Sequence, residues 1–490
     1  MRTPDRTPEA TRADETIATH DAARSTLNEA PLNSGRRSRA TLYITLIAAV
    51  AALGGLLFGF DTGVIAGAML FIVPDFHLGP AQQGLVVSAV TFGALFGALV
   101  GGTFSETIGR RWTNIVAGLS FVAGAVCSAI APNVDILIAS RVLIGLAIGM
   151  TAVAAPMYIA ELSPARSRGK LVSLFQLAVT IGILVSYVVD RALAPEQAWR
   201  WMVGLAFIPG ALLVLGMIVM PESPRWLLKT GAEKAARQAL SLVRSPAEIE
   251  AELREIQEDL GRSRPAAWSE LLMPGLRPAL MVGVGLAIFQ QVTGINTIIY
   301  YAPQIFQRAG LDSASTALAA TIGIGVVNVL STLIAIWLVD RIGRKPLLLV
   351  GLAGMIVSLV AVGAAQRFGS TIGVNRDWLA PLTIGFVGFY IVCFAFSLGP
   401  IVWLMISEIF PNRARARAAA ISTAANWMAN FLVSFSFPVL VAMMGPSLCF
   451  LYAAMGVAAF IFIVGWVPET KGKSLEEISR QWRTANPQAP

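Results

Sequence analysis

Two residues of opposite charge lie inside long apolar segments, where a charge is costly. Asp61 is in the first apolar segment and Arg141 is in the fourth. A charge at the centre of a bilayer costs about 2.5–3.5 kcal/mol on insertion scales, so each residue is the obvious partner of the other. A carboxylate that is ionised while paired with arginine, and protonated once it is released into an apolar site, can carry a proton. The pair therefore suits proton coupling, although a static ion pair that orients two helices would use the same residues.

Isolated amide side chains form a second group of candidates, because an amide both donates and accepts hydrogen bonds and so suits a solute that does the same. Gln290, Gln291 and Asn296 surround Thr293-Gly294, where an interrupted helix would expose polar groups to a cavity. The other isolated amides in apolar segments are Gln176, Asn328 and Asn426. Each amide could alternatively form an interhelical hydrogen bond, which is worth about 0.6 kcal/mol on average.

Aromatic residues and one helix-breaking pair complete a candidate solute site at mid-membrane. The ring of Trp403 could stack on a bound solute, and Gly399-Pro400 just before it could hinge the tenth segment. Phe58 would form an apolar wall of the site. Tyr300-Tyr301 would form a gate on the extracellular side.

The composition indicates that lipid surrounds the elements that position these residues. Of the 490 residues, 56% are hydrophobic and 13% are charged, and the mean hydropathy is +0.68. A soluble domain carries about 25% charged residues, so this chain needs a bilayer to cover its apolar surface. The net charge of +8 does not indicate nucleic-acid binding, because the basic residues fall mainly in short loops between apolar runs.

Apolar runs of about 20 residues predict an all-α membrane protein with twelve transmembrane helices in two six-helix halves. The predicted helices lie near 41–67, 82–104, 112–131, 134–157, 169–190, 200–220, 277–306, 314–339, 345–366, 380–407, 416–442 and 446–467. The halves are 41–220 and 277–467, and the polar segment 221–276 is predicted to form a helical linker. Residues 1–40 are expected to be a disordered N-terminal tail, and 468–490 a short C-terminal tail.

The distribution of basic residues predicts the orientation in the membrane. The short loops 2–3, 4–5, 8–9 and 10–11 hold eleven Lys and Arg, whereas the six short loops on the other side hold five. This bias places both termini and the linker in the cytoplasm. We therefore expect a multi-pass protein of the cell inner (plasma) membrane.

Charged motifs repeat at matching positions of the two halves. Gly109-Arg110-Arg111 recurs as Gly343-Arg344-Lys345, and Pro221-Glu222-Ser223 recurs as Pro468-Glu469-Thr470. Carboxylates beside guanidinium groups at these positions could latch one conformation. The sequence pairs Glu161 with Arg168 and, in the second half, Glu408 with Arg415. The residues expected in such latches are Glu106, Arg110, Glu161, Arg168, Asp340, Arg344, Glu408 and Arg415. As ordinary surface ion pairs they would contribute only about 0–1 kcal/mol each.

Residues 41–480 resemble the sugar porter family of the major facilitator superfamily, and within it the bacterial sugar–proton symporters for xylose, galactose or arabinose. The motifs that carry the resemblance are the two repeated arginine loops, Pro156–Glu161, Pro221–Leu227, Gln290–Asn296, Ser407–Pro411 and Pro468–Gly472. The resemblance implies the major facilitator fold with two pseudo-symmetric halves. It also implies that the amides contact sugar and that Asp61 couples protons with Arg141. Facilitative members of the family generally have a neutral residue at the position of Asp61. Glu106 departs from the superfamily loop, which usually has Asp there.

The leading interpretation is a proton-coupled symporter that imports a pentose or hexose by alternating access and works as a monomer. A facilitative sugar or polyol (inositol-like) uniporter of the same fold is the first alternative. A sugar-binding membrane sensor would usually add a long cytoplasmic tail, and only about 20 residues follow Pro468. The apolar segments offer no paired carboxylates, no metal cluster and no nucleophile–base pair, so we expect no enzyme, no catalytic residues, no metal and no cofactor.

Overall fold

The computed structural model describes residues 34–164, 167–262, 270–271, 273, 276–368, 371 and 376–471. The N-terminal half comprises α2 (Ser34–Phe76), α3 (Pro80–Thr107), α4 (Arg110–Ala129), α5 (Val134–Leu162), α6 (Arg168–Leu193), α7 (Trp199–Gly204) and α8 (Phe207–Val219). The linker holds α9 (Pro224–Lys229), α10 (Glu233–Ser241) and α11 (Pro246–Arg262). The C-terminal half comprises α12 (Arg277–Val292), α13 (Ile295–Arg308), α14 (Ala314–Ile342), α15 (Arg344–Phe368), α16 (Arg376–Phe396), α17 (Leu398–Glu408), α18 (Asn412–Met444) and α19 (Leu448–Trp466).

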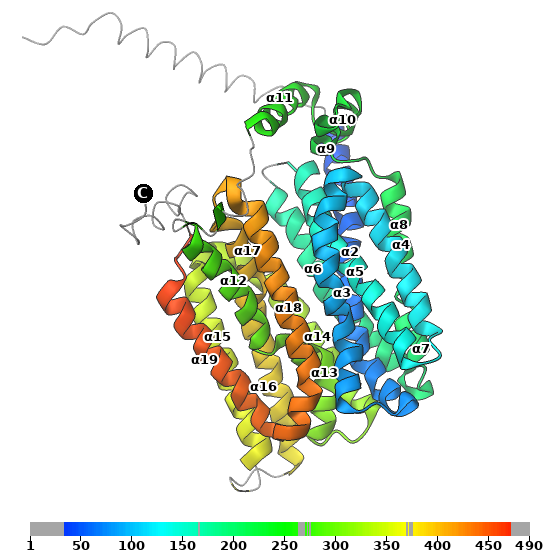
Figure 1. Ribbon diagram of the computed structural model, residues 1–490, viewed down its shortest axis with the longest axis vertical. Helices are drawn as coiled ribbons and strands as arrows, with labels where there is room; N and C mark the ends of the chain where they lie inside the picture. Colours follow the sequence, from blue (N-terminus) through cyan, green and yellow to red (C-terminus); the bar gives the residue numbers. More distant parts are fainter. Residues whose placement is uncertain are drawn as a thin grey trace, which may run out of the picture.

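Twelve membrane-spanning segments account for this helix order. Eleven stretches within the described residues are long and apolar enough to cross a membrane, and the stretch Arg417–Trp466 contains most of α18 and all of α19. Figure 1 shows the two halves side by side, with α9–α11 capping one end of the bundle. We call this the linker end and the opposite end, near α7, the distal end. The predicted fold class is thereby confirmed.

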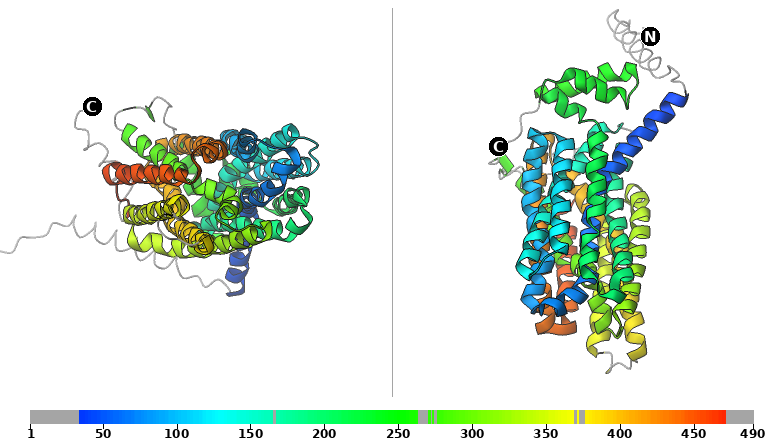
Figure 2. Two further views of the ribbon diagram at one scale, coloured as in Figure 1. Left: turned by 90° about the horizontal axis from the view of Figure 1, so that it is seen from below. Right: turned by 90° about the vertical axis from the view of Figure 1, so that its right-hand side faces the viewer.

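The boundaries of several predicted elements differ from the sequence-based ones. Helix α2 begins at Ser34, so the last seven residues of the predicted disordered tail are helical, and residues 1–33 lie outside the described part. The polar start of this helix projects from the bundle at the linker end (Figure 2). An apolarity criterion misses it because a helix can continue into water beyond its membrane-spanning part.

The linker helices have a small hydrophobic core of their own. Ala236 and Leu240 of α10 pack with Ile249 and Leu253 of α11. Arg244 fixes this unit to the transmembrane bundle, because its Nη1 donates a hydrogen bond to the carbonyl of Leu162 at the end of α5 (3.3 Å). The predicted segment 221–276 therefore contains packed helices, while its domain boundaries stay a prediction.

A glycine at every fourth position brings α2 against α6. A β-carbon at Gly55 would lie 2.4 Å from the carbonyl oxygen of Phe175, and one at Gly59 would lie 1.9 Å from that of Val179. One turn further, a β-carbon at Gly63 or Gly67 would meet side chains of α6 at 2.0 and 2.4 Å. Small residues at one helix face allow this close approach in membranes, where van der Waals packing holds helices together.

Two spans of the C-terminal half are broken near mid-membrane. The seventh span divides into α12 and α13 at Thr293-Gly294, as predicted, and Gly294 has φ 94°, which favours glycine. The tenth span divides at Ser397 rather than at the predicted Gly399-Pro400. Proline is tolerated in the first turn of a helix but clashes with the carbonyl four residues earlier. Pro400 therefore lies in the first turn of α17, and the break precedes it.

Candidate functional site

Four of the six predicted amides form one hydrogen-bonded cluster between α12, α13 and α18. Asn296 Nδ2 donates to Gln291 Oε1 at 2.6 Å, and Gln291 Nε2 donates to Asn426 Oδ1 at 3.1 Å. Asn426 Nδ2 in turn donates to Gln290 Oε1 at 2.7 Å. Asn296 is half-buried whereas the other three amides are buried. The cluster thus presents donors and acceptors that a ligand rich in hydroxyl groups can exchange for its own.

The break in the tenth span anchors this cluster. Gln290 Nε2 donates to the carbonyl oxygens of Leu398 (2.8 Å) and Gly399 (3.2 Å), at the start of α17. Tyr390 of α16 donates to the carbonyl of Thr293 at 2.9 Å, beside the break in the seventh span. The broken tenth span therefore supplies carbonyls that Gln290 satisfies, and the broken seventh span supplies a carbonyl that Tyr390 satisfies. Irregular backbone is tolerated at membrane depth in this way.

Two predicted amides lie outside the cluster. Gln176 is on α6 and is half-buried, and Asn328 is on α14 with 9% of its surface exposed. Within the described part of the chain neither side chain forms a hydrogen bond, and the two residues lie on helices of opposite halves. Both amides are therefore available to bind a ligand.

Aromatic rings surround the cluster. Phe58 of α2 packs against Trp427 of α18 with ring centroids 5.4 Å apart, so the predicted apolar wall joins the two halves. Trp427 was not singled out from the sequence, yet it follows Asn426 directly and its buried indole N–H has no hydrogen-bond partner among the described residues. Trp403 of α17 is 38% exposed, which leaves its ring available for stacking.

Asp61 and Arg141 meet as predicted. Arg141 Nη1 and Nη2 lie 3.4 Å from Asp61 Oδ1 and Oδ2, and both residues are buried, with 2% and 3% of their surfaces exposed. Arg141 Nε also donates to the carbonyl of Val86 on α3 at 2.7 Å. A tight charge-assisted pair measures about 2.7–2.9 Å. The pair is therefore loose on the aspartate side, while the arginine is fixed by a backbone carbonyl.

The predicted tyrosine gate lies where the two halves touch, toward the distal end from the amide cluster. Tyr300 faces Thr62 of α2 and Asn430 of α18. Tyr301 donates to the carbonyl of Ser434 at 3.4 Å. Across the halves, Tyr187 of α6 donates to the carbonyl of Ile299 at 3.0 Å. These buried tyrosines join α13 to both halves on one side of the site.

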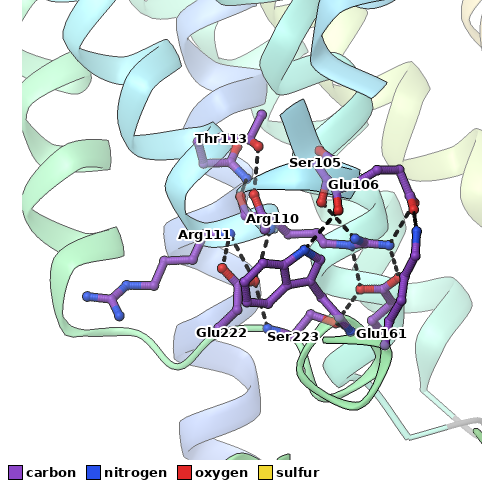
Figure 3. Close-up of polar contacts among 12 residues, drawn as sticks. Ser105, Glu106, Arg110, Arg111, Thr113, Glu161, Glu222 and Ser223 are labelled. Atoms are coloured by element: carbon purple, nitrogen blue, oxygen red, sulfur yellow. Dashed lines mark hydrogen bonds and ion pairs between the residues drawn. The ribbon is translucent and has the colours of Figure 1, made fainter. Parts of the chain in front are cut away.

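A charged network joins helix ends at the linker end of the N-terminal half (Figure 3). Arg110 Nη2 donates to Glu161 Oε1 at 3.0 Å and to Glu106 Oε1 at 3.3 Å. Glu161 also accepts a hydrogen bond from the hydroxyl of Ser223. The carboxylate of Glu222 accepts the backbone N–H of Arg110 at 2.9 Å, at the beginning of α4. A carboxylate there also interacts favourably with the helix dipole.

The C-terminal half repeats this network. Arg344 Nη2 donates to Glu408 Oε1 at 3.1 Å, and Thr470 donates to Glu408 Oε2 at 2.6 Å. Glu469 accepts the backbone N–H groups of Arg344 (3.1 Å) and Lys345 (3.0 Å) at the beginning of α15. Each half therefore joins an arginine loop, the end of its fourth span and the segment after its sixth span.

The two capping glutamates differ in their environment. Burial raises the pKa of the Glu222 carboxyl, and the N–H groups of Ser223, Arg111 and Arg110 offset only part of that rise. Burial acts in the same direction on Glu469, but its backbone hydrogen bonds outweigh burial and the pKa is lowered. The same motif thus holds a carboxylate that is stabilised as the anion in the C-terminal half only.

The partners of Glu161 and Glu408 differ from those that the sequence suggested. Glu161 contacts Arg110 instead of Arg168, which is exposed and makes no polar contact with the part of the chain that the structure describes. Arg415 donates to the carbonyl of Phe410 (3.2 Å) while Glu408 binds Arg344. Each of these two glutamates, at the end of a helix, contacts the arginine at the beginning of another helix instead of the arginine of the loop that follows it. The side chain of Asp340 lies outside the described part of the chain.

Several residues of the site were missed by sequence reasoning. The two networks depend on Glu222, Ser223 and Thr470. The sequence signal that could have found them is the motif Pro221-Glu222-Ser223, which recurs 247 residues later as Pro468-Glu469-Thr470. Asp190 at the end of α6 is a second buried carboxyl, which accepts the backbone N–H of Gly67 at 3.1 Å. An acidic residue at the edge of an apolar run is easily assigned to the adjoining loop, which explains the omission.

Comparison with known proteins agrees with this geometry. The family model described as "Sugar (and other) transporter" matches residues 47–482. The galactose-proton symporter of Escherichia coli strain K12 is 41% identical over 449 residues, covering 91% of this chain and 95% of the relative. The D-xylose transporter of Levilactobacillus brevis is 41% identical over 436 residues, covering 88% of this chain and 94% of the relative.

Solved structures give the same result. The partially occluded inward-open form of the xylose transporter XylE from E. coli superposes with a TM-score of 0.77 at 34% identity, covering 88% of this chain and 99% of XylE. XylE, described as a proton:xylose symporter of the major facilitator superfamily and bound to 6-bromo-6-deoxy-D-glucose, superposes with a TM-score of 0.75 at 36% identity. That match covers 90% of this chain and 99% of XylE. The chain belongs to the sugar transporter family of the major facilitator superfamily.

Proposed function

We propose that this chain is a proton-coupled symporter that moves a monosaccharide, a pentose or a hexose, across the membrane by alternating access. The observation that carries the proposal is the buried Asp61–Arg141 pair in a chain that also holds the amide cluster of Gln290, Gln291 and Asn426. Relatives named as galactose-proton and arabinose-proton symporters support the same assignment.

The amide cluster acts as the sugar site. Its amides already pair with one another, so a sugar hydroxyl replaces an existing hydrogen bond rather than filling an empty one. Apolar and stacking surfaces for the sugar ring come from Phe58, Trp403 and Trp427. Gln176 and Asn328 supply further hydrogen bonds from the other helices.

Asp61 carries the proton and Arg141 controls its release. While the carboxylate is paired it stays ionised, and when the pair separates in an apolar site the carboxyl takes up a proton. The long 3.4 Å contacts fit a pair that separates during the cycle. Tyr300 lies next to this region and shares α13 with Asn296, so movement of α13 links the proton site to the sugar site.

The two charged networks at the linker end act as latches that form in one state and open in the other. In the state described here the halves contact each other at the distal end through Tyr187 and Ile299. All side chains of residues 168–178 of α6 are exposed or half-buried near the linker end. We assign this structure to the state that is open toward the linker end, in which both networks are formed. We infer that they open when the two halves meet at that end.

The orientation and assembly complete the proposal. The linker end and both termini face the cytoplasm of the inner (plasma) membrane, as the eleven-to-five bias of basic residues predicts. Each chain holds a complete site between its own halves, so it functions as a monomer. The division into halves 41–220 and 277–467 follows the helix order.

The test is uptake of labelled sugars into proteoliposomes with and without an inward proton gradient. The panel contains D-xylose, D-galactose, L-arabinose, D-glucose and myo-inositol, and the variant is Asp61→Asn. We expect wild type to accumulate at least one monosaccharide, and the variant to retain counterflow exchange without gradient-driven accumulation. Asp75→Asn is the matched control, because Asp75 is on the same helix but exposed at the distal end.

Three outcomes would change the proposal. Uptake that only equilibrates and does not respond to the gradient or to Asp61→Asn would make the chain a facilitator with a structural ion pair. Accumulation of inositol alone would move the substrate class to cyclic polyols. Transport of none of the panel by a folded protein would contradict monosaccharide transport.

A further inference from the structure

A cavity of about 300 Å³ lies inside the C-terminal half, apart from the amide cluster. Its walls come from α13, α15, α16, α18 and α19. Most of the lining is aliphatic or aromatic, and includes Ile298, Leu359, Val362, Phe386, Phe437 and Tyr452. Small-molecule sites have this character, with volumes from about 300 Å³ upward and a few polar groups that fix orientation.

Ser358 is one of the polar residues in this apolar wall, beside Thr297, Gln366, Tyr390 and Tyr452. The hydroxyl of Ser358 lines the cavity, has 1% of its surface exposed and has no hydrogen-bond partner among the described residues. An unsatisfied buried hydroxyl costs about 1–3 kcal/mol. A serine in a helix usually binds its own backbone, but the Ser358 hydroxyl does not. It is therefore available to a ligand in the cavity.

A cation lies at the mouth of the same cavity. Arg308 ends α13 at the distal end, lines the cavity and is exposed. It has no ion pair or hydrogen bond with any residue that the structure describes, although an acidic partner would be the usual arrangement. Gln366 of α15 lines the cavity too, eight residues after Ser358 and therefore about 12 Å further along the helix.

We propose that this cavity binds an aromatic carboxylic acid that carries a hydroxyl group at the far end of its ring. The carboxylate pairs with Arg308, the ring packs between Phe386, Phe437 and Tyr452, and the hydroxyl bonds to Ser358. Charge, aromatic walls and the deep hydroxyl together select this class over a simple fatty acid.

The position of the cavity gives the ligand an effect on transport. Thr297, Ile298 and Ile305 of α13 form part of its wall, while Asn296 and Tyr300 of the same helix belong to the sugar site and the gate. A ligand there holds α13 in its present position and slows transport without competing with sugar. This effect rests on the proposed function, whereas the binding itself does not.

The binding test uses equilibrium dialysis of labelled 4-hydroxycinnamate with the purified full-length protein in neutral detergent. We expect one saturable site, weakened at least tenfold by Arg308→Gln and abolished by Val362→Trp, which fills the cavity. Arg191→Gln, at the distal end of α6 in the other half, is the matched control and leaves binding unchanged. Unlabelled cinnamate, which lacks the hydroxyl, should displace the probe from wild type more weakly than unlabelled 4-hydroxycinnamate does. From Ser358→Ala the two compounds should displace the probe equally well.

Three results would overturn the proposal. They are equal affinity in wild type and Arg308→Gln, insensitivity to Val362→Trp in a variant that melts like wild type, and displacement of the probe by transported sugar. Because dialysis requires no transport, failure of sugar uptake would leave the binding result intact. If binding is confirmed, proteoliposome uptake should show a lower maximal rate with an unchanged sugar KM.

Discussion

A β-carbon on Gly109 would lie 2.3 Å from Oε2 of Glu222, which caps the helix that the glycine precedes. Gly109 has φ 96° and ψ 165°, a conformation that is essentially reserved for glycine. Its counterpart Gly343 has φ 111°, and a β-carbon there would lie 3.0 Å from Glu469. The glycine before each repeated arginine is therefore required by the capping carboxylate and by the backbone.

Gly109→Ala should lower the free energy of unfolding by about 1–3 kcal/mol from backbone strain alone, with a further loss from displacement of Glu222. Thermal unfolding of the purified protein in detergent measures this effect. Gly102→Ala is the control, because a β-carbon at Gly102 meets nothing within 4 Å. Equal effects of the two substitutions would contradict the account of the cap.

Separating Asp61 from Arg141 by mutation should cost stability as well as coupling. Arg141→Gln leaves a buried carboxyl without its cation, and loss of one partner of a buried pair costs about 3–5 kcal/mol. The double variant Asp61→Asn/Arg141→Gln should recover part of this loss, because no unpaired charge remains. Melting temperatures of both single variants and the double variant measure the coupling, and strictly additive losses would argue against a functional pair.

Removing an amide from the cluster should weaken sugar binding while leaving the fold intact. Asn426→Ala removes hydrogen bonds to Gln290 and Gln291, and a site built to bind hydroxyl groups is expected to lose about tenfold or more in affinity. The measurement is the sugar concentration that gives half-maximal counterflow. Gln83→Ala serves as control, because Gln83 binds only the carbonyl of Leu78 at the distal end.

The capping glutamates should respond to pH in opposite directions. The pKa of Glu469 is lowered by backbone N–H groups, so its stabilisation is present above the unfolded value of about 4.3 and is lost as the pH falls through the folded value. The pKa of Glu222 is raised by burial, so folding disfavours its anion and this carboxyl becomes less favourable as the pH rises.

The matched variants Glu469→Gln and Glu222→Gln test this difference. Glu469→Gln should lower the melting temperature more at pH 7 than at pH 4.5. For Glu222→Gln the loss relative to wild type should be larger at pH 4.5 than at pH 7. The same pH trend in both variants would show that the two caps have equivalent environments.

Much of the fold could be predicted from the sequence because the bilayer imposes simple rules on it. Twelve apolar runs gave the spans, and Thr293-Gly294 located the break between α12 and α13. The charges of Asp61 and Arg141 identified each other because each lies well inside an apolar run, whereas the buried Asp190 lies at the edge of one. Local chemistry was sufficient wherever the partner was the only one available.

The remaining features depend on where helix ends meet in space. The sequence suggested Arg168 as the partner of Glu161, but Arg110 lies closer although it is 51 residues away. The break at Ser397 depends on a clash with the backbone before Pro400, which sequence position alone places too late. Trp427 was overlooked because a tryptophan in an apolar run is indistinguishable from one that faces lipid.

The close packing of α2 on α6 divides mechanical roles between the two halves. With Gly59 and Gly63 in contact with the opposite backbone or side chains, these helices cannot slide or separate without losing packing along their whole length. They move together as one rigid unit, and the chain bends at the broken spans, at Gly294 and Ser397. A disulfide engineered between α2 and α6 should then be harmless, whereas one that ties α12 to α13 should arrest the protein in a single state.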